Sequence, residues 1–265
     1  MKISLYKLNE IVICPNCRGS IELTESEGTE CLSCGELYRR LPYSWELIPS
    51  SLKSLELLET WQQLQENGLI AYTEDPENNL SIGERLDCLN FARFCRFDGL
   101  VLDVGCGIQP WPSYFASFSE RTRFIGVDPL VGESPADYLQ IRSVGEFLPF
   151  VDQTFDHILF ATSLDHVIDP IQSLTEARRI SKQNGEIDIW ISEKSPCTPK
   201  PEISHEWYEN LEKPEEAEDV FHFRQLNSNI LKLFFDKVGL QIVEEERHRT
   251  DEYRRRYFYK VKSID

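Results

Sequence analysis

The sequence predicts an α/β fold, in which a largely parallel sheet is covered by helices on both faces, preceded by a small metal-binding module. Two observations carry this prediction. From Leu100 onward, short apolar runs alternate with segments of helical character, as they do in βαβ units. Before residue 50, four of the eight cysteines stand in two closely spaced pairs.

The paired cysteines predict a zinc site. They follow the pattern C-x2-C-x13-C-x2-C, at Cys14, Cys17, Cys31 and Cys34. Thiolates two residues apart can converge on one ion, and in a reducing compartment disulfides are the weaker explanation. Four sulfur ligands leave no position for water or substrate, so we expect a structural Zn²⁺. We expect a zinc-ribbon module over residues 1–50, with short strands around 21–23 and 36–39.

Two helices are predicted between the cysteines and the first strand of the sheet. Residues 52–66 carry apolar side chains at helical spacing, and Asn67-Gly68 predicts the end of this helix. Ser81 and Glu84 have capping-box spacing for a second helix that runs to residue 96. Residues 51–80 are therefore expected to form a helix and a linker, and residues 81–265 the main domain.

Five strands are expected in that domain, with helices between most of them: 100–104, 123–127, 139–144, 155–161 and 185–192. The clearest helix covers residues 170–183. Asp169 can cap its first turn, Pro170 suits that turn, and Asn184-Gly185 predicts its end.

The C-terminal part predicts one more helix near 228–238 and two strands near 240–248 and 253–262. These strands are close enough in sequence for an antiparallel pair. Three consecutive arginines, Arg254 to Arg256, begin the last strand. We interpret them as the protective charges of a solvated edge strand rather than as a phosphate site.

The composition bounds the partners of the chain. Its formal net charge of −17 opposes a broad contact with RNA or DNA, because such contacts gain affinity from Lys and Arg on phosphates. The sequence contains no apolar stretch of membrane-spanning length, and its N-terminus lacks the features of a signal peptide. We therefore expect a cytoplasmic protein.

A glycine-containing turn, "VLDVGCGIQPWP" at residues 101–112, marks the expected ligand site. In an open α/β sheet the ligand lies at the carboxyl ends of the strands, and the first strand ends at Asp103. A dinucleotide would place its pyrophosphate against this carboxylate, where like charges repel. S-adenosylmethionine carries a cationic sulfonium and ammonium, so Asp103 can attract it while Gly105 and Gly107 let the backbone approach. Pro110 replaces the third glycine of a dinucleotide fingerprint and fits the first turn of a following helix.

Asp128 supports the same ligand. It ends the next strand, in "RFIGVDP", where an acidic side chain can accept hydrogen bonds from both ribose hydroxyls. An aspartate at a strand end is also a common turn residue, so the signal gains its meaning only together with the glycine-containing turn.

These motifs resemble the class I S-adenosylmethionine-dependent methyltransferases, type 11 branch, over about residues 81–262. The resemblance rests on the order of "VLDVGCG", "FIGVDP", "GEFLPFVDQTFDHILFATSLDHVIDP" and "EARRISKQNGEIDIW". It implies a Rossmann-like, doubly wound sheet of seven strands with an antiparallel last strand. It also implies S-adenosylmethionine as the cofactor, with Asp103, Gly105 and Gly107 at its methionine end and Asp128 at its ribose.

The same resemblance implies contacts to the adenine and to the methyl group. Gly145, Glu146 and Phe147 stand where the family lines the adenine, and Ala161 stands where it faces the transferable methyl group. An aspartate that many members place just before this run is Val144 here. A backbone group or Glu146 is expected to replace it.

Two histidines are the candidates for a catalytic base. Methyl transfer from a sulfonium is an in-line displacement, in which the protein mainly aligns the acceptor and excludes water. An alcohol acceptor also gains from a base of near-neutral pKa, which points to histidine. His166 follows the fourth strand, beside the expected methyl position and next to Asp165, although it could instead simply pack the following helix. His222 precedes the helix near residue 228, where the family's substrate-side cover returns to the sheet.

Residues 193–225 are too long for an ordinary connection and are expected to form a substrate lid. Aromatic side chains in this segment could stack on a sugar ring or a flat metabolite: Trp207, Tyr208, Phe221 and Phe223. We interpret the acidic run from Glu215 to Asp219 as a solvated face rather than a metal site.

Three functions remain open. The leading one is methylation of a small molecule or glycan, on oxygen, in a surface-polysaccharide or secondary-metabolite pathway. An alternative is an rRNA guanine methyltransferase whose zinc module grips RNA, because the order of the zinc knuckles, "LPYSWELIPSS" and the catalytic domain is similar in such enzymes. The third is a non-catalytic cofactor-binding partner protein, since the module also resembles a ribbon protein that activates other methyltransferases.

Overall fold

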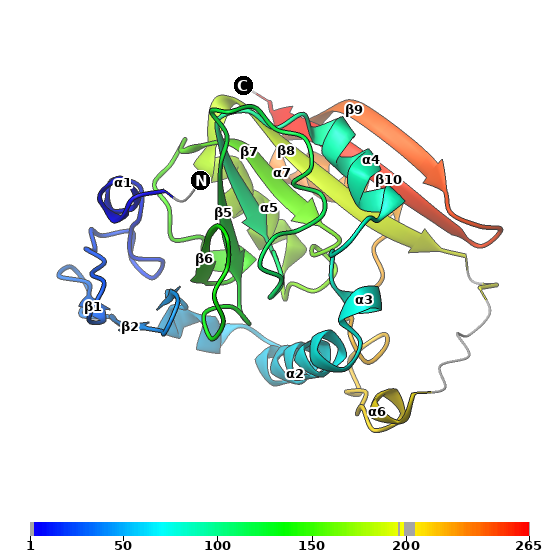
Figure 1. Cartoon of the computed structure of the whole chain (residues 1–265), viewed down its shortest axis with the longest axis horizontal. Helices are drawn as coiled ribbons and strands as arrows, with labels where there is room; N and C mark the ends of the chain where they lie inside the picture. The colour runs from blue at the N-terminus through cyan, green and yellow to red at the C-terminus, as the bar shows by residue number, and fades with distance from the viewer. Residues whose placement is uncertain (1–2, 196, 199–204, 265) are drawn as a thin grey trace.

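Seven strands of the central sheet lie in the order β6-β5-β4-β7-β8-β10-β9 (Figure 1). The computed structural model describes residues 3–195, 197–198 and 205–264. The strands are β4 (Leu100–Val104), β5 (Arg123–Asp128), β6 (Leu139–Arg142), β7 (Phe155–Ala161), β8 (Ser181–Lys194), β9 (Leu240–Arg249) and β10 (Arg254–Ser263). Strands β4 to β8 run parallel, and β10 is antiparallel to both β8 and β9. The predicted doubly wound sheet with an antiparallel last strand is confirmed.

The order of the strands creates a crevice. From β4 the chain proceeds outward through β5 and β6, and it then returns to the other side of β4 to form β7 and β8. At such a reversal the loops that leave the two central strands diverge, and a ligand can lie between them. The loops after β4 and β7 are therefore the ones that frame a site.

Successive side chains of each strand point to opposite faces of the sheet, so the core is divided between the two faces. Leu102 packs in the cluster that includes α5 (Pro170–Ile180) and α7 (Ser228–Val238), whereas Val101 packs in the cluster that includes α4 (Leu86–Cys95). Because successive side chains of a strand point to opposite faces, the apolar strands bury both sides under helices. This is the expected two-faced arrangement.

The N-terminal segment extends the same sheet beyond β6 (Figure 1). Its elements are α1 (Leu5–Asn9), β1 (Thr29–Glu30), β2 (Leu37–Arg40) and β3 (Trp45–Glu46). β3 pairs in parallel with β6 through Glu46 and Arg142. The strand expected around 21–23 does not form there, because Leu23 exchanges its backbone hydrogen bonds with the side-chain amide of Asn9 (2.9 and 3.0 Å).

Helix α2 (Leu58–Glu74) differs from the prediction at both ends. It follows a 3₁₀ turn, η1 (Ser50–Ser54), and it runs through Asn67 and Gly68, which were expected to end it. The buried side-chain amide of Asn67 donates to the backbone carbonyls of Glu212 and Val220 (2.9 and 2.7 Å). Asn67 therefore binds a segment far along the chain instead of terminating its own helix.

Helix α4 also begins later than predicted. The presumed linker contains α3 (Pro76–Asn79), and the N-cap of α4 is Arg85, with no capping hydrogen bond from a side chain. The capping box at Ser81 is wrong. The carbonyl of Ser81 accepts a hydrogen bond from the N–H of Ser113 (2.6 Å), so this residue anchors the loop after β4 rather than a helix.

The connection between β4 and β5 contains turns where a helix was expected after Pro110. The structure describes all of residues 105–122 and assigns none of them to a helix. Pro112 removes a second backbone donor from this stretch. Tyr114 and Phe115 are buried, and the ring of Phe115 stacks on Phe124 of β5 at 3.9 Å. Aromatic burial thus fixes the loop in place of helical hydrogen bonds.

Helix α5 begins as predicted and ends earlier. Oδ1 of Asp169 accepts the N–H groups of Ile171 and Gln172 (2.9 and 3.1 Å), which confirms the cap. β8 starts at the residue after the helix, so Asn184-Gly185 lies within a strand, at an irregularity in its pairing with β7.

Strand β10 is an inner strand, so the interpretation of Arg254 to Arg256 as an edge is wrong. The strand is paired on both sides, by β8 and β9. The edge beside it is β9, whose residues after Leu240 alternate between exposed and partly buried.

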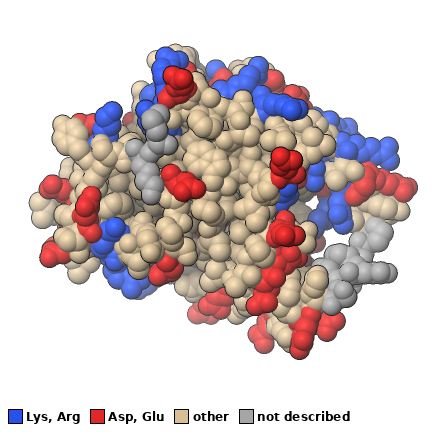
Figure 2. All heavy atoms as spheres, viewed as in Figure 1, with Lys and Arg blue, Asp and Glu red and all other residues tan. Residues whose placement is uncertain are grey.

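The surface charge is unevenly distributed. On the face shown in Figure 2, acidic side chains gather at the lower right, over α6 (Glu206–Glu209) and the chain that follows it. Exposed carboxylates there include Glu206, Glu209, Glu212, Glu215 and Glu216. Among the helices that the structure describes, none has the length and apolar character needed to cross a bilayer.

Candidate active site

The crevice at the carboxyl ends of the parallel strands holds a pocket of about 350 Å³. Its walls come from the ends of β4, β5 and β7, from the short helix η2 (Gly145–Phe147), from α2 and from residues 221–222. A volume in this range suits a small ligand, since ligand pockets run from roughly 300 to 1,000 Å³.

The loop after β4 requires glycine at two positions. Gly105 and Gly107 have φ angles of +77° and +66°, which favour glycine. A Cβ atom on Gly105 would lie 2.3 Å from the Cβ of Ser163, in the loop after β7. The N–H of Gly105 donates to the carbonyl of Val127 at the end of β5 (2.8 Å). The loops after β4 and β7 are therefore in close contact at one wall of the pocket.

Asp103 lies beneath this loop and does not reach the pocket wall. Its side chain is fully buried, and its Oδ2 accepts a hydrogen bond from the hydroxyl of Tyr114 (2.6 Å). Its Oδ1 has no hydrogen-bond partner among the described residues. Burial raises the pKa of Asp103 to about 7, the bond from Tyr114 opposes the rise, and the charge of Asp128 adds to it.

Asp128 lines the pocket. Oδ2 accepts the N–H of Gly107 and Oδ1 that of Leu130, each at 2.9 Å, so the carboxylate fixes the glycine-containing loop to the end of β5. Burial raises the pKa of Asp128 to about 6, and the two backbone hydrogen bonds limit that rise. Each oxygen keeps a lone pair that a ligand hydroxyl can use.

The residues expected at the adenine divide into two groups. Val144, Gly145 and Glu146 line the pocket. Phe147 is absent from the residues that line the pocket, and it packs against an apolar cluster that includes Trp61 and Leu64 of α2. Phe147 turns away because η2 points its side chain into the apolar cluster under α2.

Glu146 is tied to the chain before α5. Its Oε1 accepts the N–H groups of Ile168 and Asp169 (2.6 and 2.9 Å), and the side chain is buried. Burial raises its pKa, and these backbone bonds oppose the rise. Because this oxygen is engaged, the backbone at Val144 and Gly145 is better placed to meet a ligand than the Glu146 carboxylate.

Ala161 closes the strand β7 at the pocket, followed by Thr162 and Ser163, which also line it. Thr162 has a φ of +59° and donates its N–H to the carbonyl of Trp190 (3.0 Å), and the Ser163 hydroxyl donates to the carbonyl of Val104. The small side chain of Ala161 leaves space at the centre of the crevice.

The two candidate histidines come together in the pocket. The rings of His166 and His222 lie 4.3 Å apart, tilted by 37°. Nδ1 of His166 faces the carbonyl of Phe221 (3.1 Å) and Nδ1 of His222 faces Oδ1 of Asp219 (2.8 Å). Both acceptors require Nδ1–H, which leaves each Nε2 with a free lone pair. The two Nε2 atoms each lie 3.9 Å from an oxygen of Asp165.

The environments of the two rings separate their pKa values. Burial, together with the charge of His222, lowers the pKa of His166. For His222 burial acts in the same direction, but the hydrogen bond to Asp219 and the charge of Asp165 outweigh it and raise its pKa. Asp219, which the sequence placed in a solvated acidic run, is thus the partner of a pocket histidine.

Sequence reasoning missed one wall of the pocket. Arg85 and Asp87 at the start of α4, Trp190 and Ser192 on β8, and Arg256 on β10 all line it. Strand alternation places Trp190 on the face of α4, and β10 pairs Arg256 with Ser192. The sequence offered that alternation, but it did not show that β10 lies next to β8.

The four paired cysteines meet as predicted from their spacing. Sγ of Cys14 lies 3.7 Å from that of Cys34, and Sγ of Cys17 lies 3.5 Å from that of Cys31. All four sulfur atoms lie within 4.8 Å of one another. A tetrahedral Zn²⁺ with bonds of about 2.3 Å separates its sulfur ligands by about 3.8 Å, so the donor set fits this ion.

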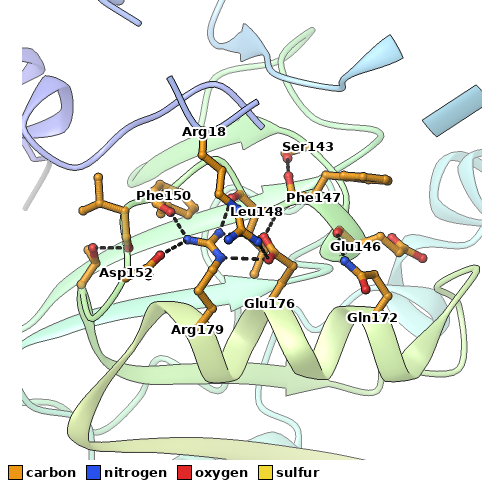
Figure 3. A network of polar contacts seen from close by, with 12 residues as sticks. Arg18, Ser143, Glu146, Phe147, Leu148, Phe150, Asp152, Gln172, Glu176 and Arg179 are labelled. Carbon is orange, nitrogen blue, oxygen red and sulfur yellow. Dashed lines mark hydrogen bonds and ion pairs between the residues drawn. The ribbon is translucent and has the colours of Figure 1, made fainter. Parts of the chain in front are cut away.

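A polar network joins residues 14–18, the first cysteine knuckle, to α5 (Figure 3). Glu176 of α5 is buried and accepts hydrogen bonds from Arg18, which follows Cys17, and from Arg179 (3.1 and 2.8 Å). Its second oxygen accepts the N–H of Leu148, just after η2 (3.2 Å). The knuckle is therefore connected through one carboxylate to the segment that borders the pocket.

Comparison with known proteins identifies the domain. Residues 102–189 match the family model described as "Methyltransferase domain". The chain contains a class I S-adenosylmethionine-dependent methyltransferase domain. The matched part of this methyltransferase domain runs from β4 into β8 and includes the glycine-containing loop, Asp128, Ala161 and His166.

The unpartnered Oδ1 of Asp103 fits the cofactor of the methyltransferase domain. A buried carboxylate oxygen without a partner favours a cation or a donor nearby, and S-adenosylmethionine carries both. A phosphate ligand would add negative charge beside Asp103 and Asp128.

Relatives of the methyltransferase domain are distant. A demethylmenaquinone methyltransferase of Bacillus cereus is 30% identical over 99 residues, which cover 33% of this chain and 42% of that protein. The chain thus spans less than half the length of the curated relatives that it matches.

Two solved structures share the fold. The 1,6-didemethyltoxoflavin-N1-methyltransferase of Burkholderia thailandensis has a TM-score of 0.57 and 10% identity, over 90% of this chain and 100% of that one. The [4+2]-cyclase SpnF has a TM-score of 0.51 and 14% identity, over 85% and 99%. At such identities the likeness concerns the fold alone.

Proposed function

We propose that this chain transfers a methyl group from S-adenosylmethionine to an oxygen atom of a small molecule. One observation carries the proposal: a pair of imidazoles, each held by an acceptor at Nδ1, shares one pocket with Asp128 and the glycine-containing loop. The names of the Bacillus and Burkholderia proteins, which refer to demethylmenaquinone and 1,6-didemethyltoxoflavin, support a small-molecule acceptor.

The cofactor half of the pocket follows from the residues already described. S-adenosylmethionine supplies the activated methyl group when it is bound. Asp128 binds the ribose hydroxyls, and the backbone at Val144 and Gly145 borders the adenine. Asp103, which lies beneath Gly105 and Gly107, stabilises the positive charge of the cofactor. Ala161 keeps the centre of the crevice open for the acceptor.

His222 is the catalytic base of this proposal. Its Nδ1–H donates to Asp219, so Nε2 can accept the proton of an acceptor hydroxyl while Asp219 stabilises the resulting imidazolium. His166 has a lowered pKa, remains neutral at neutral pH, and orients the acceptor through its own Nε2. Residues 205–225 of the predicted lid carry both Asp219 and His222 to the site, whereas Glu193 and Lys194 at its predicted start belong to β8.

A glycan acceptor would reach this pocket only with one terminal sugar, because the volume is about 350 Å³. The rRNA alternative finds less support, since exposed carboxylates gather over α6 and would repel phosphates (Figure 2). The non-catalytic alternative does not explain why two imidazoles with fixed tautomers face the pocket.

We also propose that Cys14, Cys17, Cys31 and Cys34 hold a structural Zn²⁺. With residues 1–50 as the zinc-ribbon module and 51–80 as its connection, residues 81–265 form the methyltransferase domain. The ion takes no part in the transfer, because four thiolates complete its coordination.

The experiment incubates the purified protein with methyl-labelled S-adenosylmethionine and separated small-molecule, glycan, RNA and protein fractions of its host. We expect label in the small-molecule fraction. His222→Gln should lower the rate by about 10²- to 10⁴-fold and leave S-adenosylhomocysteine binding unchanged. His205→Gln, at an exposed histidine outside the pocket lining, is the matched control and should retain full activity. Label in RNA alone would refute the proposal.

A further inference from the structure

The wall formed by α4, β8 and β10 carries positive charge in a protein whose net charge is −17. Nη2 of Arg85 lies 3.0 Å and Nη2 of Arg256 lies 3.2 Å from the same oxygen of Asp87. One carboxylate cannot neutralise two guanidinium groups, so this trio keeps one net positive charge. Both arginines are about two-thirds buried (side-chain exposures 32% and 30%), which weakens screening by solvent.

Some hydrogen-bond donors of this wall have no partner among the described residues. Each of the three guanidinium nitrogens of Arg85 already has a partner, either Asp87 or the carbonyl of Leu80 (2.9 Å). Arg256 forms an ion pair with Asp87, its side chain makes no hydrogen bond among the described residues, and its guanidinium lies 5.9 Å from the centre of the Trp190 ring. The indole Nε1–H of Trp190 is buried and has no partner among the described residues. An unpaired buried donor is costly, and a ligand oxygen would relieve that cost.

The sheet separates this wall from the acidic end of the pocket. In the order β5-β4-β7-β8-β10, Asp128 at the end of β5 and Arg256 on β10 are four strand spacings apart, roughly 19 Å at about 4.8 Å per strand. Ala161 on β7 lies between them. It is two strand spacings, or roughly 10 Å, from Arg256. The pocket is therefore acidic where the cationic cofactor is expected and basic beyond the position of the methyl group.

We propose that the methyl acceptor is an organic carboxylate, whose anionic group binds Arg256, Ser192 and the Nε1–H of Trp190. This inference rests on the proposed function, because it names the class of its acceptor. Arg256 provides a planar fork for the carboxylate, Arg85 holds Asp87 and so keeps Arg256 in position, and the hydroxyl to be methylated lies up to roughly 10 Å away, toward Ala161 and His222. A hydroxy acid with a single aromatic ring fits that span.

The experiment measures binding by calorimetry, with S-adenosylhomocysteine-loaded protein and two probes, 4-hydroxybenzoate and its methyl ester. We expect the acid to bind roughly tenfold more tightly than the ester, as for loss of a charge-assisted hydrogen bond. Arg256→Gln should abolish this preference, and Arg256→Lys, which keeps the charge without the fork, should retain part of it. Arg254→Gln, on the same strand outside the pocket, should bind both probes like the wild type.

Equal affinities for acid and ester, a preference that survives Arg256→Gln, or failure of both probes to bind at millimolar concentration would overturn the proposal. Binding of S-adenosylhomocysteine is measured first. Its absence would instead refute the proposed function, so the two failures are distinguishable.

Discussion

Asp103 and Asp128 show how the fold turns two ordinary aspartates into a site for a cation. Both side chains are buried, and burial raises their pKa values, to about 7 and about 6. Such groups are unfavourable as anions until a cation or donor reaches them, so ligand binding and ionisation are coupled.

Cofactor affinity should therefore depend on pH. Because the cation prefers ionised Asp103, affinity should rise by up to tenfold per pH unit between about pH 6 and 7, rise more steeply below about pH 6, where Asp128 also titrates, and level off above pH 7. Calorimetric titration with S-adenosylmethionine between pH 5 and 7.5 measures this affinity, with a correction for the ligand's own amine, which begins to titrate near the upper end of that range.

Asp103→Asn is the control for that titration. It should bind the cofactor more weakly and keep only the part of the pH dependence, below about 6, that Asp128 causes. A wild-type affinity that is constant over the whole range would show that Asp103 does not sense the ligand.

The His222–Asp219 pair predicts the pH dependence of the reaction. The pKa of His222 is raised, and the base must be neutral, so the rate should increase with pH through a limb above the usual histidine value of about 6.5. Asp219→Asn removes the negative charge and leaves at most a weaker hydrogen bond from the amide oxygen, so the limb should move to lower pH and the plateau rate should fall. A limb that stays in place in this variant would exclude His222 as the titrating base.

At the residue scale, the sequence identified the important side chains more reliably than it predicted their roles. Spacing and strand ends selected the carboxylates, the glycines and both histidines. The sequence could not show that Asp103 lies beneath the loop, that Asp219 binds His222, or that Phe147 faces α2, because each depends on a neighbour from another part of the chain.

Helix α2 shows how an element can contradict its local signal. Asn67-Gly68 is a typical helix end, yet the helix continues to Glu74 because the Asn67 amide binds residues 212 and 220. A Cβ on Gly68 would meet no atom within 4 Å, and its φ is not among the positive ones.

Gly68→Ala therefore distinguishes the two interpretations. Within a continuous helix, alanine should raise the free energy of unfolding by about 0.5–1 kcal/mol, measured by urea denaturation. At a left-handed helix end the same change would lower it. Gly239→Ala, at the C-cap of α7 with a φ of +73°, is the matched control and should be destabilising.

Elements whose conformation is encoded by neighbouring residues were predictable from the sequence. Elements whose conformation depends on burial against other parts of the chain were not. The strands β4, β5 and β7 and the cap of α5 lie where apolar runs and Asp169 placed them. The loop after β4 was predicted as helical, but Tyr114 and Phe115 gain more from burial against β5 than from a helix that starts between two prolines.

At the scale of the molecule, the N-terminal knuckles and the methyltransferase domain share one core. Cys14 and Leu23 pack in the same cluster as Leu102 and Ile158, and β3 continues the sheet past β6. Arg18 of the first knuckle binds Glu176, which also holds Leu148 (Figure 3).

Loss of the metal should therefore affect the whole chain. Cys14→Ser should lose the bound zinc, lower the melting temperature of a single transition and weaken S-adenosylhomocysteine binding, measured by metal analysis, calorimetry and titration. Cys197→Ser changes an exposed cysteine outside the cluster and should leave all three unchanged. An unchanged cofactor affinity in zinc-free protein would show that the Arg18–Glu176 contact does not influence the pocket.

The sequence by itself determined the class of the fold, the four cysteines, and the loop and strand ends that face the ligand. These depend on local periodicity, spacing and backbone conformation, which neighbouring residues encode. Only the tertiary structure decided that β10 lies between β8 and β9, that Arg256 and Trp190 border the pocket, and that His166 meets His222. Such contacts join segments separated by many residues, and their free energy arises from burial and charge that exist only once the chain has folded.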